Sequence, residues 1–160
     1  MAILCTALMA GLFYSYSCSV NPGLAKLPDA QYLAAMQHIN RAILNPAFFA
    51  AFFGALVLLP LGAFLHYETP AGMRFWLLVA ATIVYGAGLF GVTVFGNVPL
   101  NEMLNGFSIA SATQEEITVM RQQFEAPWNL WHMVRTAAVI LALILALAAC
   151  IVPARKVAGL

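Results

Sequence analysis

The chain has 160 residues, of which 63% are hydrophobic and 8% are charged, and its formal net charge is +1. Soluble domains carry about 25% charged residues, so this composition excludes an ordinary soluble protein and favours one embedded in a membrane. The near-neutral charge and the lack of a basic run leave nucleic-acid binding without support.

Four apolar runs account for most of the chain. They cover about residues 2–20, 46–65, 75–95 and 131–152, and each approaches the ~20 residues that a helix needs to cross a hydrocarbon core. The sequence therefore predicts an all-α integral membrane protein, a four-transmembrane-helix bundle that forms one domain over residues 1–160. The first run lacks a basic segment and a small-residue cleavage site, so we expect a retained span rather than a signal peptide.

The link after the first run predicts a short interfacial helix. The first span ends at Asn21-Pro22-Gly23, and Pro28 then opens a helix over about residues 28–44. An apolar stripe follows one side of this helix and a polar stripe follows the other, which is typical of a helix at the membrane surface. The polar stripe consists of Gln31, His38, Arg41 and Asn45.

The second and third spans are predicted to be antiparallel neighbours, joined by a short turn over residues 66–72. Asn45-Pro46 supplies an N-cap and a first-turn proline for the second span. Glycines in the third span allow close helix approach in lipid. If the helix continues past Pro99, Asn97 and Asn101 share a face; a kink or loop at the proline is equally compatible with the sequence.

A second interfacial helix is expected over about residues 113–124, because Thr113 and Glu116 form a capping box. Pro127 then begins the last span. The residues Trp128, Trp131, His132 and Arg135 follow the spacing of one helix face. An arginine at that depth is costly unless it is paired, reaches the interface or has a function.

The number of spans places residues 38–45, 97–101 and 128–135 at the same membrane surface. The basic pair Arg155-Lys156 favours both termini in the cytoplasm. The three cysteines lack a Cys-x-x-Cys spacing, which disfavours a membrane disulfide oxidoreductase.

Taken together, these motifs resemble a known family. Gln37-His38-Ile39-Asn40-Arg41 with Asn45-Pro46, Asn97-Val98-Pro99-Leu100-Asn101 and Trp128-x-x-Trp131-His132-x-x-Arg135-Thr136 resemble the membrane family of unknown function that includes the fungal anthrone oxygenases. The resemblance covers nearly the whole chain. It implies a small four-helix membrane protein that oxidises a tricyclic polyketide anthrone to the anthraquinone with molecular oxygen, without an evident metal or flavin.

Such a reaction needs a base that works near neutral pH and donors for a developing oxyanion. His132 is the predicted base, His38 is the second candidate, and Arg135 is predicted to stabilise the negative charge. The predicted substrate-binding residues are Asn97, Asn101, Trp128, Trp131, Asn40 and Arg41. We expect no metal ligand and no cofactor. The expected partners are an apolar aromatic molecule or lipid, molecular oxygen and the membrane.

Structural roles for the same residues remain open. The two tryptophans could belong to an aromatic belt at the membrane interface, and Arg135 could reach the interface or pair with Glu102 or Glu125. Exposure to solvent would explain His38, and Asn97 and Asn101 could satisfy the backbone around Pro99.

Two other functions also remain open. The chain could be a non-catalytic binder that orients a lipid, a quinone or another apolar molecule in the bundle. It could instead be a metal-dependent oxidoreductase, in which His38, His132 and Glu102 or Glu125 hold non-haem iron or copper.

Overall fold

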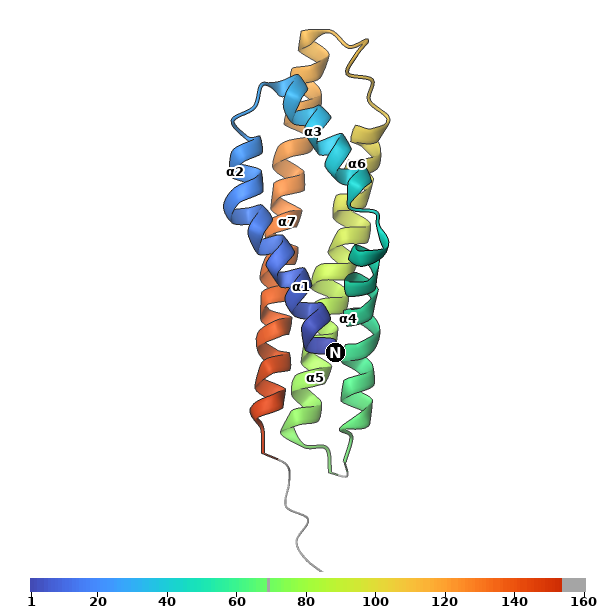
Figure 1. The fold of residues 1–160 in the computed structure, drawn as a ribbon, viewed down its shortest axis with the longest axis vertical. Coiled ribbons are helices and arrows are strands. Elements are labelled where there is room, and N and C mark those ends of the chain that lie inside the picture. Colours follow the sequence, from blue (N-terminus) through green and yellow to red (C-terminus); the bar gives the residue numbers. More distant parts are fainter. Residues whose placement is uncertain (69, 154–160) are drawn as a thin grey trace, which may run out of the picture.

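Four long helices make up most of the molecule (Figure 1). The computed structural model describes residues 1–68 and 70–153, and within them the regular elements are all helical. Four helices are long and apolar enough to cross a membrane: Ala2–Leu24, Pro46–Leu65, Met73–Asn105 and Gln114–Ile151. The predicted all-α, multi-pass membrane protein is confirmed. The cytoplasmic location of the termini stays a prediction, since Arg155 and Lys156 lie outside the described residues.

The first long helix continues past Pro22, where the sequence predicts its end. It consists of α1 (Ala2–Ser15), the π-helical turn η1 (Tyr16–Val20) and α2 (Asn21–Leu24). A proline lacks the backbone N–H, and its ring crowds the carbonyl four residues earlier. The wider π-helical turn, which ends two residues before Pro22, relieves this crowding, and the helix passes through the proline.

The third long helix also continues through a proline that follows a π-helical segment. It contains α5 (Met73–Ile83), the π-helical segments η2 (Val84–Gly91) and η3 (Thr93–Asn97), and α6 (Val98–Asn105). The segment η3 ends two residues before Pro99, just as η1 ends two residues before Pro22. The helix therefore extends well beyond residue 95, and Asn97 and Asn101 lie on one helical segment, as the helical alternative predicts.

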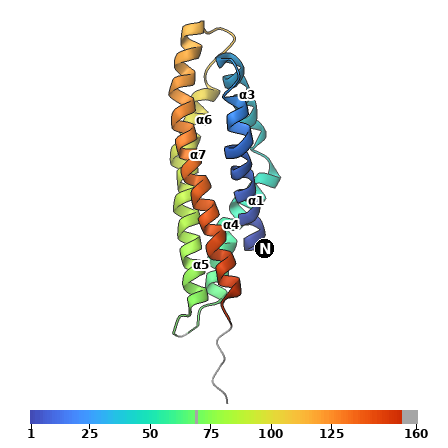
Figure 2. The ribbon, with the colours of Figure 1, turned by 90° about the vertical axis from the view of Figure 1, so that its left-hand side faces the viewer.

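Helix α7 (Gln114–Ile151) unites residues that the sequence divides between an interfacial helix and the last span. The predicted capping box at Thr113 and Glu116 is confirmed at its first turn. Pro127 lies inside this helix rather than at the start of a new one. On one side of the proline α7 packs against α3, and on the other side it packs against α1, α5 and η2. Figure 2 shows α7 as one continuous helix along both groups of neighbours.

Two further helices complete the chain: α3 (Asp29–Ala42) and α4 (Pro46–Leu65). The predicted N-cap of α4 is confirmed, because Asn45 Oδ1 accepts a hydrogen bond from the Phe48 N–H at 3.0 Å. Helix α3 lies across one end of the bundle, beside α6 and the first half of α7 (Figure 1). We call α3, α6 and residues 114–128 of α7 the cap. Its buried side chains include Leu33, Met36, Leu104 and Phe124.

The four long helices enclose a second, longer core of apolar side chains, including Leu59, Tyr85 and Leu89. Helix η2 approaches α7 closely at Gly88, where an added Cβ would lie 2.6 Å from the Ala138 Cβ. Such a distance is far inside van der Waals contact. Glycine is therefore required at this crossing, in keeping with the use of small residues between helices in lipid.

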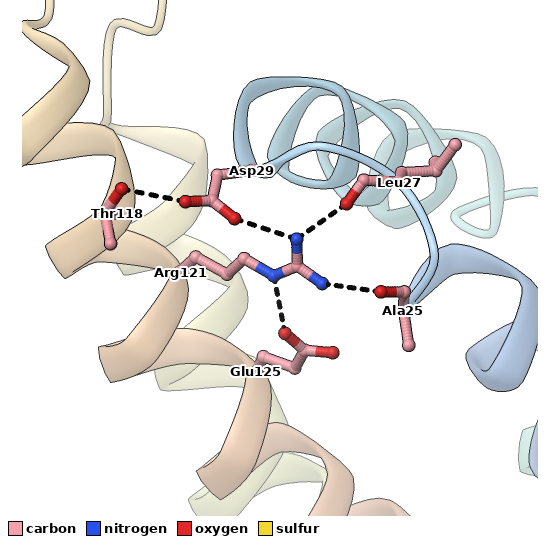
Figure 3. A network of polar contacts seen from close by, with 6 residues as sticks. All are labelled: Ala25, Leu27, Asp29, Thr118, Arg121 and Glu125. Atoms are coloured by element: carbon pink, nitrogen blue, oxygen red, sulfur yellow. Dashed lines mark hydrogen bonds and ion pairs between the residues drawn. The ribbon is translucent and has the colours of Figure 1, made fainter.

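A polar clamp built on Arg121 holds α3 against α7 (Figure 3). The guanidinium donates to Asp29 Oδ1 at 2.9 Å and to Glu125 Oε2 at 2.6 Å, and also to the Leu27 and Ala25 carbonyls. Thr118 donates to the other Asp29 oxygen at 2.8 Å. The Thr118 hydroxyl and the Arg121 guanidinium hold the pKa of Asp29 below its ordinary value.

Candidate functional site

A cavity of about 210 Å³ lies where the membrane bundle meets the cap. One water needs roughly 10–15 Å³ of such space, so the cavity admits a molecule much larger than water or oxygen. Its lining is mostly apolar and comes from α1, η1, α3, α4, η3, α6 and α7. Among the sequence-predicted site residues, those that line it are Asn40, Arg41, Asn101, Trp128, His132 and Arg135.

His132 is 2% exposed, and its neighbours define its neutral tautomer. Ser17 donates its hydroxyl hydrogen to the Phe13 carbonyl at 3.1 Å, so it can only accept from His132 Nε2, 3.0 Å away. Thr136 likewise donates to the His132 carbonyl at 2.7 Å and lies 3.4 Å from Nε2. This pattern assigns the hydrogen to Nε2 and leaves the lone pair on Nδ1.

The imidazole lies among aromatic rings. Trp128 stacks on it with 5.2 Å between ring centroids and 8° between planes. Phe13 meets the imidazole edge-on at 5.7 Å, and Tyr16 lies 5.9 Å away. These rings give the cavity flat apolar walls next to one nitrogen base.

Arg135 lies one turn beyond His132 and is 7% exposed. Its guanidinium carbon is 4.5 Å from the Phe13 ring centre and 5.1 Å from that of Trp128. One terminal nitrogen, Nη2, contacts His132 Nδ1 at 3.4 Å, while Nε has no hydrogen-bond partner. Within the described residues both ion pairs belong to Arg121, so the alternative in which Arg135 pairs with Glu102 or Glu125 does not occur.

Asn97 and Asn101 hold Trp128 from two sides. Asn97 is fully buried, and its Nδ2 donates to the Trp128 carbonyl at 3.2 Å. Asn101 Oδ1 accepts from the indole Nε1 at 2.8 Å. Asn101 reaches the cavity, whereas Asn97 lies behind Trp128 and keeps an unpaired Oδ1. Both amides therefore face into the bundle, as expected for amides in an apolar surrounding.

Helix α3 supplies the outer wall of the cavity. The buried Nδ2 of Asn40 has no hydrogen-bond partner. Arg41 is exposed and donates from Nε to Asn105 Oδ1 at 2.9 Å. The preceding turn carries His38, which is exposed and does not line the cavity. The second candidate base is thus separated from His132.

Trp131 also lies apart from the cavity, although its spacing predicts the same face as Trp128. It is 40% exposed and packs against Gly96, where an added Cβ would approach the indole Cγ to 2.8 Å. A position three residues along a helix is rotated by about 60° from the first. That rotation, together with the slot at Gly96, turns Trp131 toward the outside. The interfacial-belt role fits Trp131 and does not fit Trp128, which is 3% exposed.

Sequence reasoning missed four residues around His132: Phe13, Tyr16, Ser17 and Thr136. Thr136 could have been found, since it follows His132 by four residues on the same helix. The other three lie in the first span, more than 100 positions away in sequence, and nothing local marks them.

A metal centre of the kind weighed in the sequence is not assembled. Among residues 1–68 and 70–153, no group of three or more His, Cys, Asp or Glu side chains could hold a metal ion. His132 is surrounded by hydroxyls, aromatic rings and a guanidinium, and Glu125 is engaged by Arg121. The two-histidine, one-carboxylate set would require His38 and His132 together, and they are apart.

Comparison with known proteins agrees with the resemblance in the sequence. A family model described as anthrone oxygenase matches residues 47–145, more than half of the chain. The match includes Asn97, Asn101, Trp128, His132 and Arg135. No curated protein and no solved structure matches the chain. The chain belongs to the anthrone oxygenase family.

Proposed function

We propose that the protein oxidises a planar polycyclic phenolic molecule of the anthrone type to a quinone with molecular oxygen, without a tightly held cofactor. One observation carries the proposal. A buried imidazole with its lone pair on Nδ1 and an arginine without a carboxylate partner share one aromatic-lined cavity. Family membership supports the same chemistry.

The reaction balances without any further reactant. An anthrone carries a methylene group opposite its ketone. Oxidation removes the two methylene hydrogens and places one atom of O₂ on that carbon as a new carbonyl, and the second oxygen atom leaves as water. Loss of the first proton gives an electron-rich, phenolate-like anion that can reduce O₂ directly. The protein must therefore provide a base and stabilise the anion.

His132 and Arg135 are proposed for these two roles. In the assigned tautomer His132 Nδ1 can accept the methylene proton, while Ser17 and Thr136 hold the Nε2–H. The imidazolium formed would then carry its new proton beside the substrate anion. Arg135, next to Nδ1, supplies positive charge for the oxygen of that anion. Trp128 and Phe13 offer faces against which a flat ring system can pack.

The principal alternative is a non-catalytic binder of an apolar aromatic molecule. It is favoured by the small number of polar groups in the cavity and by their hydrogen bonds to one another. The same walls would then orient a ligand without activating it. Oxygen consumption separates the two functions.

The test measures O₂ uptake by the purified protein in detergent or lipid discs after addition of an anthrone. Anthrones react slowly with oxygen on their own, so the rate without protein is subtracted. An anthrone with two methyl groups on the methylene carbon has no hydrogen there to lose. It serves as the substrate control and should give no uptake. We expect protein-dependent uptake with the anthrone and formation of the quinone.

His132→Ala should lower that rate by about a hundredfold or more, the usual contribution of a general base. His66→Ala is the matched control, because His66 is exposed at the opposite end of the bundle and bonds to the Gly62 carbonyl. Full activity in His132→Ala would reject His132 as the base. If none of the anthrones tested gives protein-dependent O₂ uptake, the oxidation is rejected and the non-catalytic binding function remains.

A further inference from the structure

We propose that the cavity binds its aromatic ligand as an anion, with a carboxylate or phenolate oxygen at Arg135 and a second acceptor oxygen at Asn40. The inference rests on the proposed function in taking this cavity as the ligand site. It adds the charge of the ligand and the placement of its oxygens. Two residues that line one cavity each keep a buried, unpaired donor, and these two residues carry the inference.

The first donor is Arg135, whose charge is buried without a counter-charge. Its contacts are the faces of Phe13 and Trp128 and the nitrogen of His132, and its Nε–H is unpaired. Burying a cation in this way is costly unless an anion joins it. Arg121 shows the contrast, since two carboxylates and two backbone carbonyls surround that guanidinium. The missing partner of Arg135 is therefore best supplied by a ligand.

The second donor is the Asn40 amide on α3. Its Nδ2 is buried and unpaired, and Asn40 lines the same cavity from the cap. A buried amide hydrogen without an acceptor is unfavourable, and a ligand oxygen at this wall would remove the cost. A hydrocarbon satisfies neither donor. A molecule with oxygens on two edges satisfies both.

The remaining lining selects a flat aromatic body rather than a small inorganic anion. Leu12, Ile39 and Phe48 line the cavity together with the rings around His132. Arg41 and Glu102 lie at its exposed rim with opposite charges. The buried charge of the lining is therefore that of Arg135, and it favours a negative ligand.

The test compares two unreactive probes of the same shape, anthracenecarboxylate and its neutral amide. Binding is followed without oxygen by energy transfer from tryptophan to the anthracene, since Trp128 lies at the cavity. We expect the carboxylate to bind roughly tenfold to a hundredfold more tightly than the amide, the effect of one hydrogen bond to a charged group. Equal affinities for the wild-type protein would overturn the proposal without any variant.

Variants then locate the charge that is responsible. Arg135→Gln should abolish the preference for the carboxylate, and Arg135→Lys should retain part of it. Lys26→Gln is the matched control, because it removes one exposed positive charge outside the cavity. Its preference should equal that of the wild type. A folded Arg135→Gln protein that keeps the preference would overturn the assignment, and so would loss of preference in Arg135→Lys and Lys26→Gln alike.

The second donor is tested with anthracenecarboxylates that do or do not carry a hydroxyl on the opposite ring. Asn40→Leu should remove the advantage of the hydroxylated probe and leave the carboxylate preference intact. A lipid phosphate could also approach Arg135, so an anionic phospholipid is added as a competitor. If this lipid displaces the probe at equal concentration, the ligand class is an anionic lipid and not an aromatic anion.

These outcomes are independent of turnover. Preference for the anionic probe without O₂ uptake would reject the proposed oxidation and keep the anion site. Oxidation of an anthrone without any such preference would keep the function and reject the anion site.

Discussion

Gly88→Ala tests the closest helix crossing in the bundle. The new Cβ would lie 2.6 Å from the Ala138 Cβ, a methyl group fixed to the α7 backbone. Two carbon atoms prefer about 3.5–4.0 Å, so η2 and α7 must separate by about 1 Å. Overpacking of this size costs about 1–3 kcal/mol.

Gly86→Ala is the matched control, two residues away in the same π-helical segment. There the added Cβ would have the Leu56 Cδ1 at 4.0 Å as its nearest neighbour, which is ordinary contact. Both variants lose the same backbone freedom of glycine, about 0.5–1 kcal/mol in favour of alanine. The difference between them therefore isolates the steric cost, and we expect Gly88→Ala to be less stable by about 1–3 kcal/mol.

The assay is unfolding of both variants in the same detergent mixture, followed by helical circular dichroism. Ala138→Gly in the Gly88→Ala background should restore stability, because it removes the opposing methyl group. Binding of anthracenecarboxylate should fall in Gly88→Ala alone, since Ala138 lies three residues after Arg135 on α7. Equal stability of Gly88→Ala and Gly86→Ala would refute the close crossing of η2 and α7.

Three other contacts are also tested by substitution. Ser17→Ala removes the nearer acceptor of the Nε2–H, so it should slow anthrone oxidation by about tenfold and change its pH profile, while Ser17→Thr restores the rate. An unchanged pH profile would contradict the tautomer assigned to His132. Trp128→Phe keeps a ring and loses its bond to Asn101, so stability should fall by about 1 kcal/mol, but not further in an Asn101→Leu background. The lowered pKa of Asp29 stabilises the fold above the pKa of the unfolded carboxyl, and this contribution is lost as the pH falls through the folded value. Protection of the α3 amides, taken relative to their intrinsic exchange rate at each pH, should therefore fall in acid. Asp29→Asn should remove this pH dependence, and protection that stays constant in acid would contradict the clamp.

The membrane-spanning architecture could be predicted because its signals are local. The length of an apolar run decides whether a helix can cross the hydrocarbon, and Asn45 and Thr113 cap their helices with side chains a few residues away. The ends of the first and third long helices could not be predicted from Pro22 and Pro99. Each proline follows a π-helical turn, and such a turn has no simple sequence pattern.

The part of the site on α7 could be predicted from the sequence, whereas the prediction was incomplete for the other helices. His132, Arg135 and Trp128 share a face by helical spacing alone, and the structure brings them to one cavity. The outward position of Trp131 depends on Gly96 in another helix. Likewise, the contact between Ser17 and His132 depends on how the first span packs against the last, which no local pattern reports.

Because α7 is longer than the bilayer is thick, the thickness of the bilayer affects the surroundings of the cavity. At about 1.5 Å per residue, its 38 residues extend about 57 Å, nearly twice the ~30 Å hydrocarbon core. From Thr136 to Ile151 the helix carries no charged residue, whereas its first half carries charged residues that include Arg121 and Glu125. Arg135 stands at the junction. A thicker bilayer would draw this guanidinium toward hydrocarbon and strengthen its need for an anion, and a thinner one would expose it to water. Affinity for an anionic ligand should therefore rise with the acyl-chain length of the surrounding lipid.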